Sequence, residues 1–72
     1  MFKNGEEVYM KIDCSDVQVS GYTKVCGVFG RVVPLLGRQV IVETEKLIGL
    51  EDYSYSHLAT HECFLKKCGS DG

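Results

Sequence analysis

No stretch of this 72-residue chain is long and apolar enough to cross a membrane, and neither acidic nor basic residues gather in a dense run. The 10 acidic and 8 basic side chains leave a formal net charge of -2. A general nucleic-acid binder needs clustered lysine and arginine to displace counterions, and a mimic of the DNA phosphate surface needs a dense acidic run. The composition therefore argues against a membrane protein and against both of these classes.

The sequence also lacks the patterns that most often mark catalysis. Gly27 and Gly30 are spaced like part of a phosphate-binding loop, but neither the lysine nor the following helix of such a loop is present. A cysteine nucleophile with a histidine base is conceivable, yet no segment supplies an oxyanion hole. A chain of this length also has little volume for a buried pocket. We therefore expect a protein that is not an enzyme.

Zinc is the one cofactor for which the sequence offers donors. Near the C-terminus these donors are His57, His61, Cys63 and Cys68. Two histidines four residues apart can share a helix face, and a small domain gains stability from a bound metal. However, the Cys-x2-Cys pair that best marks structural zinc is missing. We expect no cofactor, with buried free thiols and surface histidines, and we keep a zinc site as the alternative.

The N-terminal residues carry no sign of export. Residues 1–7 lack the apolar stretch of a secretion signal, which predicts a cytoplasmic protein. Thiols are kept reduced in that compartment. We therefore expect Cys14 and Cys26 to stay free, although the two could face each other across neighbouring strands.

Strand signals dominate the first half of the chain. Residues 6–13 alternate apolar and polar side chains, which is typical of a half-buried strand. Residues 14–21 are rich in serine and aspartate and predict a long loop. Residues 22–33 and 38–44 read as two further strands around a Pro/Gly turn, and this pattern predicts a central hairpin.

The second half of the chain predicts shorter elements. Residues 53–55 are interpreted as a fourth short strand, and residues 56–59 as one helical turn with Ser56 as its cap. Residues 62–67 alternate again and predict the last strand. Together these elements make residues 1–68 a single domain, and residues 69–72 are expected to form a frayed tail.

This order of elements resembles the SH3-like barrel. It has five short strands, a long first loop, a central hairpin and one helical turn before the final strand. The opening Gly5-Glu6-Glu7-Val8, the hairpin that starts at Gly27-Val28 and the segment from Tyr53 to Leu58 are similar to small KOW-like or Tudor-like barrels of bacterial and phage proteins. The resemblance covers residues 4–67 and implies an all-β, five-stranded barrel. It also implies a ligand groove lined by aromatic side chains.

Two sets of residues are candidates for binding a partner. The first is the hairpin tip, where Leu35 and Leu36 are consecutive and Arg31 and Arg38 flank them. Exposed leucines at a turn are unusual unless they dock on something, and arginine pairs well with carboxylates. The second set is aromatic and consists of Tyr9, Tyr53 and Tyr55, which are half-polar rings of the kind that line binding surfaces. The alternative is that these tyrosines only cap the ends of the barrel.

From these patterns we predict a non-catalytic interaction module in the cytoplasm that binds a protein partner. Its small size and acidic balance would suit a phage-encoded modulator of a host factor, an interpretation made by analogy. The protein could be a monomer, or a homodimer joined through an unpaired edge strand. A zinc-stapled domain and a KOW-like nucleic-acid-binding module are the alternatives, and the acidic balance fits the second one poorly.

Overall fold

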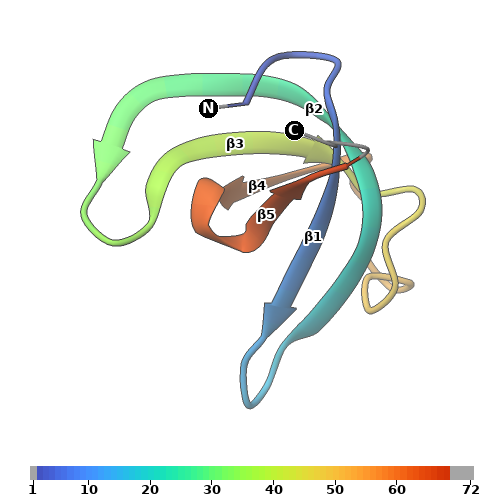
Figure 1. Ribbon diagram of the computed structural model, residues 1–72. Coiled ribbons are helices and arrows are strands. Elements are labelled where there is room, and N and C mark those ends of the chain that lie inside the picture. The colour runs from blue at the N-terminus through green and yellow to red at the C-terminus, as the bar shows by residue number, and fades with distance from the viewer. Residues whose placement is uncertain (1, 69–72) are drawn as a thin grey trace.

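The structure is a computed structural model and describes residues 2–68. Its elements in chain order are the strands β1 (Glu7–Asp13), β2 (Gln18–Val33), β3 (Gly37–Glu43) and β4 (His57–His61), the 3-10 turn η1 (Glu62–Phe64) and the strand β5 (Leu65–Lys67). The strands form one antiparallel sheet in the order β4-β3-β2-β1-β5 (Figure 1). The prediction of an all-β fold with five strands and a short helical turn before the last one is confirmed.

Strand β2 is long enough to serve both halves of the sheet. Its first part pairs with β1 and its second part pairs with β3, and the strand curves over the molecule between them (Figure 1). The register shifts between Val25 and Gly27, where two residues of β2 oppose one of β3. A bulge of this kind bends a strand. It also lets both Val25 and Val28 pack on the core, although residues three apart face opposite sides of a regular strand.

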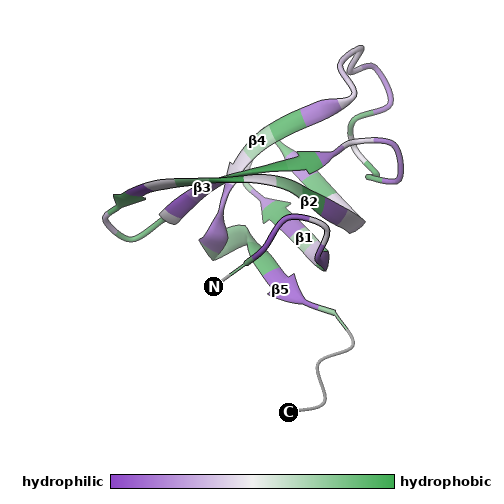
Figure 2. Ribbon diagram, turned by 90° about the horizontal axis from the view of Figure 1, so that it is seen from above, coloured by the Kyte–Doolittle hydropathy of each residue, from purple (hydrophilic) through white to green (hydrophobic). Residues whose placement is uncertain are grey.

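The core lies inside the curve of the sheet, where the alternating strands direct their apolar side chains. Figure 2 shows hydrophobic and hydrophilic residues following one another along the strands. The buried hydrophobic side chains are Val8, Met10, Val19, Val25, Val40, Val42, Leu47 and Leu65. Each buried side chain of this size contributes roughly 1.5–3 kcal/mol. Burial of this kind is the main driving force for the fold.

The two ends of the sheet differ from a closed barrel in one respect. Strands β4 and β5 are the outer strands of the order, and η1 connects them directly. Within residues 2–68 the strand ladder contains no β4–β5 pairing. Closure into an SH3-like barrel therefore stays a prediction, whereas the curved five-stranded sheet is observed.

The predicted long first loop is wrong. Strand β2 already starts at Gln18, so only four residues separate it from β1. The backbone N–H of Cys14 donates to the carbonyl of Val17 at 2.8 Å, and that of Val17 donates to the carbonyl of Cys14 at 3.3 Å. The apolar Val19 extends the alternation of β2 because it fills the core. The result is a tight hairpin.

The predicted fourth strand and helical turn are also misplaced. Residues 53–55 lie in the irregular segment between β3 and β4, and the predicted turn at residues 56–59 falls mainly in β4. The 3-10 turn comes later and occupies the first half of the predicted strand 62–67. Pairing of β4 with residues 39–43 of β3 outweighs the local capping signal of Ser56, because it buries Thr60 and half-buries Leu58.

The segment of residues 44–56 is closed at its base by one hydrogen bond, and a bridge and a buried side chain attach it to the sheet. The N–H of Thr44 donates to the carbonyl of Ser56 at 3.0 Å, which closes the base of the segment. An isolated bridge joins Ile48 to Ser20 on β2. Leu47 is buried in the core between these two attachments. The predicted tail, residues 69–72, lies outside the described residues.

Candidate functional site

The turn between β2 and β3 contains the most unusual backbone of the described chain. The N–H of Leu36 donates to the carbonyl of Val33 at 3.1 Å, and Leu35 has φ 71°. Proline at the second position and a positive φ at the third are typical of a type II turn, which normally has glycine or asparagine there. Within residues 2–68 Leu35 is the one non-glycine residue with positive φ, and its side chain is 99% exposed.

Both features of Leu35 are unfavourable in the free protein. The left-handed conformation costs an ordinary L-residue about 1–2 kcal/mol. The exposed isobutyl group gains nothing from the core. Strained residues that persist despite such a cost often lie at ligand-contacting positions. Leu35 is therefore the strongest functional candidate on this end of the molecule.

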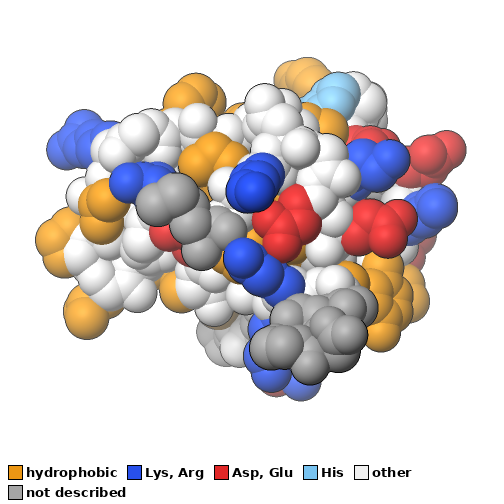
Figure 3. All heavy atoms as spheres, turned by 45° about the horizontal axis from the view of Figure 1, so that its top comes forward, with side chains coloured by type: hydrophobic (Ala, Val, Ile, Leu, Met, Phe, Trp, Pro, Cys, Tyr) orange, Lys and Arg blue, Asp and Glu red, His pale blue; other side chains and the backbone are white. Residues whose placement is uncertain are grey.

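Other exposed side chains extend the apolar surface around Leu35. Phe29 and Val32 lie on the last part of β2, where a second register shift separates the strand from regular pairing, and both are largely exposed. Arg31 lies between them and is also exposed. We call Phe29, Arg31, Val32 and Leu35 the tip surface. Figure 3 shows several hydrophobic side chains at this end, while most of the acidic side chains visible on that face lie toward the centre and the other end and basic side chains are spread across the face.

Leu36 and Arg38 also fix the base of the hairpin, through their backbones. Leu36 is half-buried, and its carbonyl accepts a hydrogen bond from the N–H of Cys63 at 3.0 Å. The N–H of Arg38 donates to Glu62 Oε1 at 2.8 Å. These two bonds fasten the base of the hairpin to η1. The backbones of Leu36 and Arg38 therefore brace the hairpin. Contact of their half-buried side chains with a partner stays a prediction, as it does for the exposed Leu35 and Arg31.

A shallow depression adjoins this brace. It has a volume of about 390 Å³ and is lined by Phe2, Val32, Arg38 and Glu62. The Nε of Arg38 is buried there without a hydrogen-bond partner. The depression continues the tip surface through Val32.

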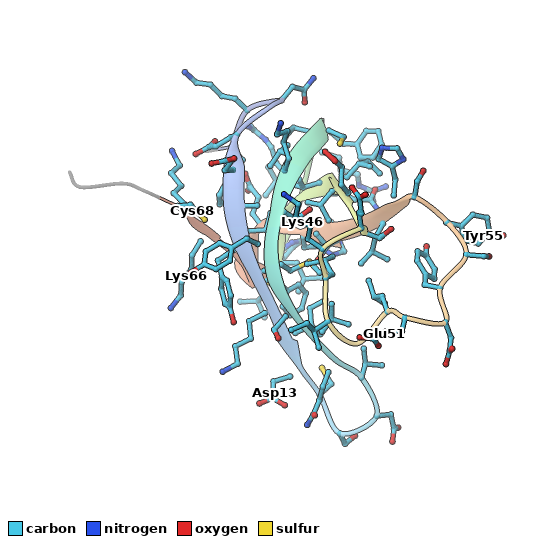
Figure 4. All side chains as sticks on the ribbon, turned by 90° about the vertical axis from the view of Figure 1, so that its right-hand side faces the viewer. Asp13, Lys46, Glu51, Tyr55, Lys66 and Cys68 are labelled. Atoms are coloured by element: carbon cyan, nitrogen blue, oxygen red, sulfur yellow. The ribbon has the colours of Figure 1, made fainter. Side chains whose placement is uncertain are left out.

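The predicted aromatic groove is not assembled as one unit. Tyr9 pairs with Tyr22 across β1 and β2, with ring centroids 5.0 Å apart and an interplanar angle of 64°. Tyr53 and Tyr55 form a second edge-to-face pair, 5.3 Å apart, in the 44–56 segment. Figure 4 shows Tyr55 on the outside of this segment, across the view from Lys66, the β5 neighbour of Tyr9.

A small pocket lies beside Tyr22, a tyrosine that is not among the predicted binding residues. The pocket has a volume of about 150 Å³, and the Tyr22 side chain next to it is 65% exposed. Besides Tyr22, its lining residues are Glu7, Thr23, Lys24, Glu43, Glu45 and Lys46. The hydroxyl of Thr23 donates to the carbonyl of Glu43, which holds β2 against the end of β3. We call this site the acidic pocket because three carboxylates and two ammonium groups line it.

The proposed zinc ligands are not brought together. His57 and His61 lie four positions apart on one strand, which separates them by about 13 Å. On a helix the same spacing would have placed them on one face, as the zinc alternative requires. Among residues 2–68 no group of three or more His, Cys, Asp or Glu side chains is arranged to hold a metal ion.

The four cysteines are free thiols, but the expectation that they are buried is wrong, because Cys14, Cys26 and Cys63 are exposed and Cys68 is half-buried. Two of them have an altered pKa. Partial desolvation raises the pKa of Cys26, and the nearby carboxylate of Glu43 raises it further. Desolvation also raises the pKa of Cys68, with added repulsion from Glu7 and Glu6. A nucleophilic cysteine needs the opposite shift, toward the thiolate at neutral pH. Neither thiol is therefore activated for covalent catalysis.

This electrostatic environment predicts slow alkylation. We expect iodoacetamide to modify Cys26 and Cys68 more slowly than it modifies glutathione at about pH 7.5, because a raised pKa leaves less thiolate. The difference should narrow as the pH rises above the ordinary cysteine pKa of about 8.5. Peptide mass spectrometry over a time course measures both rates. A rate faster than that of glutathione at either site would contradict the argument.

No protein-family model, no curated protein and no solved structure matches this chain. The described residues also contain no helix that is long and apolar enough to cross a membrane. What the two surfaces can bind therefore follows from their geometry and charge.

Proposed function

We propose that this protein is a non-catalytic interaction module that docks on a protein partner through the tip surface. The observation that carries the proposal is Leu35, which is fully exposed and has a left-handed backbone. Removing its side chain from water into a partner's apolar pocket would contribute roughly 1.5–3 kcal/mol. That gain is large enough to offset the backbone cost once the partner is bound.

The remaining tip residues indicate the chemistry of the partner. Phe29 and Val32 widen the apolar contact, and Arg31 adds a guanidinium that matches a carboxylate in a two-bond geometry. The best-fitting partner surface is a pocket that accepts the leucine side chain and has carboxylates around it. Because η1 braces the base of the hairpin, little conformational freedom is lost on docking.

The two tyrosine pairs are proposed as secondary contacts. Tyr9, Tyr53 and Tyr55 lie on surfaces other than the tip, so a large partner would have to wrap around the molecule to reach them. A cytoplasmic modulator of a host factor remains the biological setting that we propose by analogy. Its support is the small size and the acidic balance of the chain.

A matched pair of aspartate substitutions tests the proposal. Leu35→Asp alters the tip surface, whereas Ile48→Asp alters a 66% exposed residue on the 44–56 segment, outside the tip surface. Tagged wild-type protein and both variants are incubated with a nuclease-treated cell lysate, and the captured proteins are quantified by mass spectrometry. We expect Leu35→Asp to reduce capture at least tenfold, equivalent to about 1.4 kcal/mol, and Ile48→Asp to leave it unchanged.

Folding is checked by far-ultraviolet circular dichroism on all three proteins. Leu35→Asp should keep the β-sheet spectrum because Leu35 makes no core contact. Equal capture by wild type and Leu35→Asp would show that the tip is not the docking surface. Leu36 is left unchanged in this test because it is half-buried and joined to η1.

A further inference from the structure

We propose that the tip surface of one copy docks in the acidic pocket of a second copy, so that the chain associates head to tail. This inference rests on the proposed function, because it uses the same tip surface and names its partner. The occupant of the pocket is the β2–β3 hairpin of another molecule. The tip surface of one copy and the acidic pocket of the next copy are then the two sides of one interface.

The two surfaces are complementary in charge, and the pocket has room for the side chain at the tip. The acidic pocket offers the carboxylates of Glu7, Glu43 and Glu45 beside the exposed ring of Tyr22. Arg31 at the tip can pair with a carboxylate, and a guanidinium also stacks well on an aromatic ring. A volume of about 150 Å³ equals that of about five waters, which suits one four-carbon side chain such as that of Leu35.

The lysines at the pocket moderate this attraction. Lys24 and Lys46 line the same pocket and offset two of its three carboxylates. Lys24 also lies directly opposite Glu7 in the pairing of β1 with β2. The net attraction for one arginine is therefore modest, and the apolar contact of Leu35 has to supply much of the affinity. We expect association that is reversible and visible at high protein concentration.

The positions of the two surfaces exclude contact within one chain. The hairpin tip lies at the left of Figure 1, whereas Lys46 lies near the centre of Figure 4, which views the molecule from the right of Figure 1. An interface between two different surfaces leaves one free tip and one free pocket after each addition, until the rotation between subunits closes a ring. The predicted assemblies are therefore open chains, or rings where the rotation closes, and they grow with concentration.

Two double variants separate the halves of the interface. The tip variant Arg31→Glu/Leu35→Gly keeps the pocket, and the pocket variant Glu7→Lys/Glu45→Lys keeps the tip. All four positions are exposed, so both proteins should fold. In sedimentation-velocity experiments we expect the average mass of the wild type to rise past that of a dimer as concentration increases. Each variant alone should stay monomeric, and an equimolar mixture should form a one-to-one dimer and nothing larger.

Nuclear magnetic resonance identifies the surfaces in that mixture. When the unlabelled pocket variant is added to the ¹⁵N-labelled tip variant, amide shifts should change around Tyr22, Lys24 and Lys46. The mixed dimer should also weaken several-fold when salt rises from about 0.1 M to about 1 M, where the Debye length falls from about 10 Å to about 3 Å.

Three results would overturn the inference. The first is a wild type that stays monomeric at millimolar concentration. The second is a tip variant that associates as the wild type does. The third is a mixture that stays monomeric while the wild type associates, which would indicate a different interface, such as symmetric pairing of β4 edges. None of these depends on the lysate comparison of Leu35→Asp with Ile48→Asp, which tests tip docking on other proteins separately.

Discussion

Replacing Gly49 with alanine is expected to lower the free energy of unfolding by about 3 kcal/mol. Gly49 has φ +104°, a conformation that L side chains rarely adopt. A Cβ added there would overlap the carbonyl oxygen of Gln18 and lie 3.2 Å from the Cα of Val19. Both neighbours are backbone atoms of β2, so no side-chain rotation can relieve the overlap.

The expected loss has two parts. The left-handed backbone alone costs alanine about 1–2 kcal/mol. The overlap also pushes the 44–56 segment away from β2, where the amides and carbonyls of Ser20 and Ile48 exchange hydrogen bonds of 3.0 and 2.8 Å. Displacing the segment would expose Leu47, whose burial contributes roughly 1.5–3 kcal/mol. In a domain of this size that is a large part of the total stability.

Gly5→Ala is the matched control for this prediction. Gly5 also has a positive φ, +86°, but an added Cβ would meet nothing within 4 Å. It should therefore lose only the backbone part, about 1 kcal/mol. Urea unfolding followed by circular dichroism gives both values. If the two variants were equally stable, close packing of Gly49 on β2 would not be what fixes the segment.

The sequence was a good guide where side chains alternate against one core. In β1 the polar and apolar residues alternate, and Val8 and Met10 are fully buried as that pattern requires. The central hairpin was also predictable, because Pro34 can lie only in the turn and Gly37 adopts the positive φ expected of it.

Elements that depend on a neighbouring strand could not be predicted from local signals. Residues 57–61 become β4 because they pair with the free edge of β3 over residues 39–43, and no local sequence signal reveals this edge. The bulge after Val25 has the same origin: it reverses the alternation, so that Val28 also packs on the core. Tyr53 and Tyr55 alternate like strand residues, but no strand lies beside them to pair with.

In the candidate sites, too, some features follow from the local sequence and others depend on contacts between strands. Leu35 and Leu36 are equivalent in the sequence, and the turn geometry exposes one of them while the other half-packs beside η1. The acidic pocket combines residues from β1, β2 and the end of β3, which meet only through the strand register. From the sequence alone, Glu43 and Glu45 can therefore be interpreted only as outward-facing charges. The contact of Tyr22 with Tyr9 depends on the pairing of β1 with β2.

Leu35→Gly is expected to make the protein more stable while it abolishes docking. Glycine adopts the left-handed conformation without strain, which removes the penalty of about 1–2 kcal/mol. Glycine also makes the unfolded chain more flexible. This favours the unfolded state by about 0.4–1 kcal/mol and cancels part of the gain. The net expectation is a rise in the free energy of unfolding of about 0.5–1 kcal/mol. Urea unfolding measures this change, and the lysate assay measures the loss of capture.

Two further variants separate strain relief from a general effect of glycine. Leu35→Asn should stabilise as well, because asparagine tolerates the left-handed region without adding flexibility to the unfolded chain. Leu36→Gly should destabilise by about 1 kcal/mol or more, because it removes a half-buried side chain beside η1. A Leu35→Gly variant less stable than the wild type would show that the backbone of Leu35 is not strained. The argument from strain to docking would then fail.

This prediction is informative because one substitution is expected to raise the free energy of unfolding and to abolish docking. A residue selected only for folding would not combine a left-handed backbone with a fully exposed isobutyl group, since glycine at the same position removes both penalties. Natural proteins often retain such unfavourable residues where function requires them. If Leu35→Gly gains stability and loses capture, the leucine is maintained by what it touches outside its own fold.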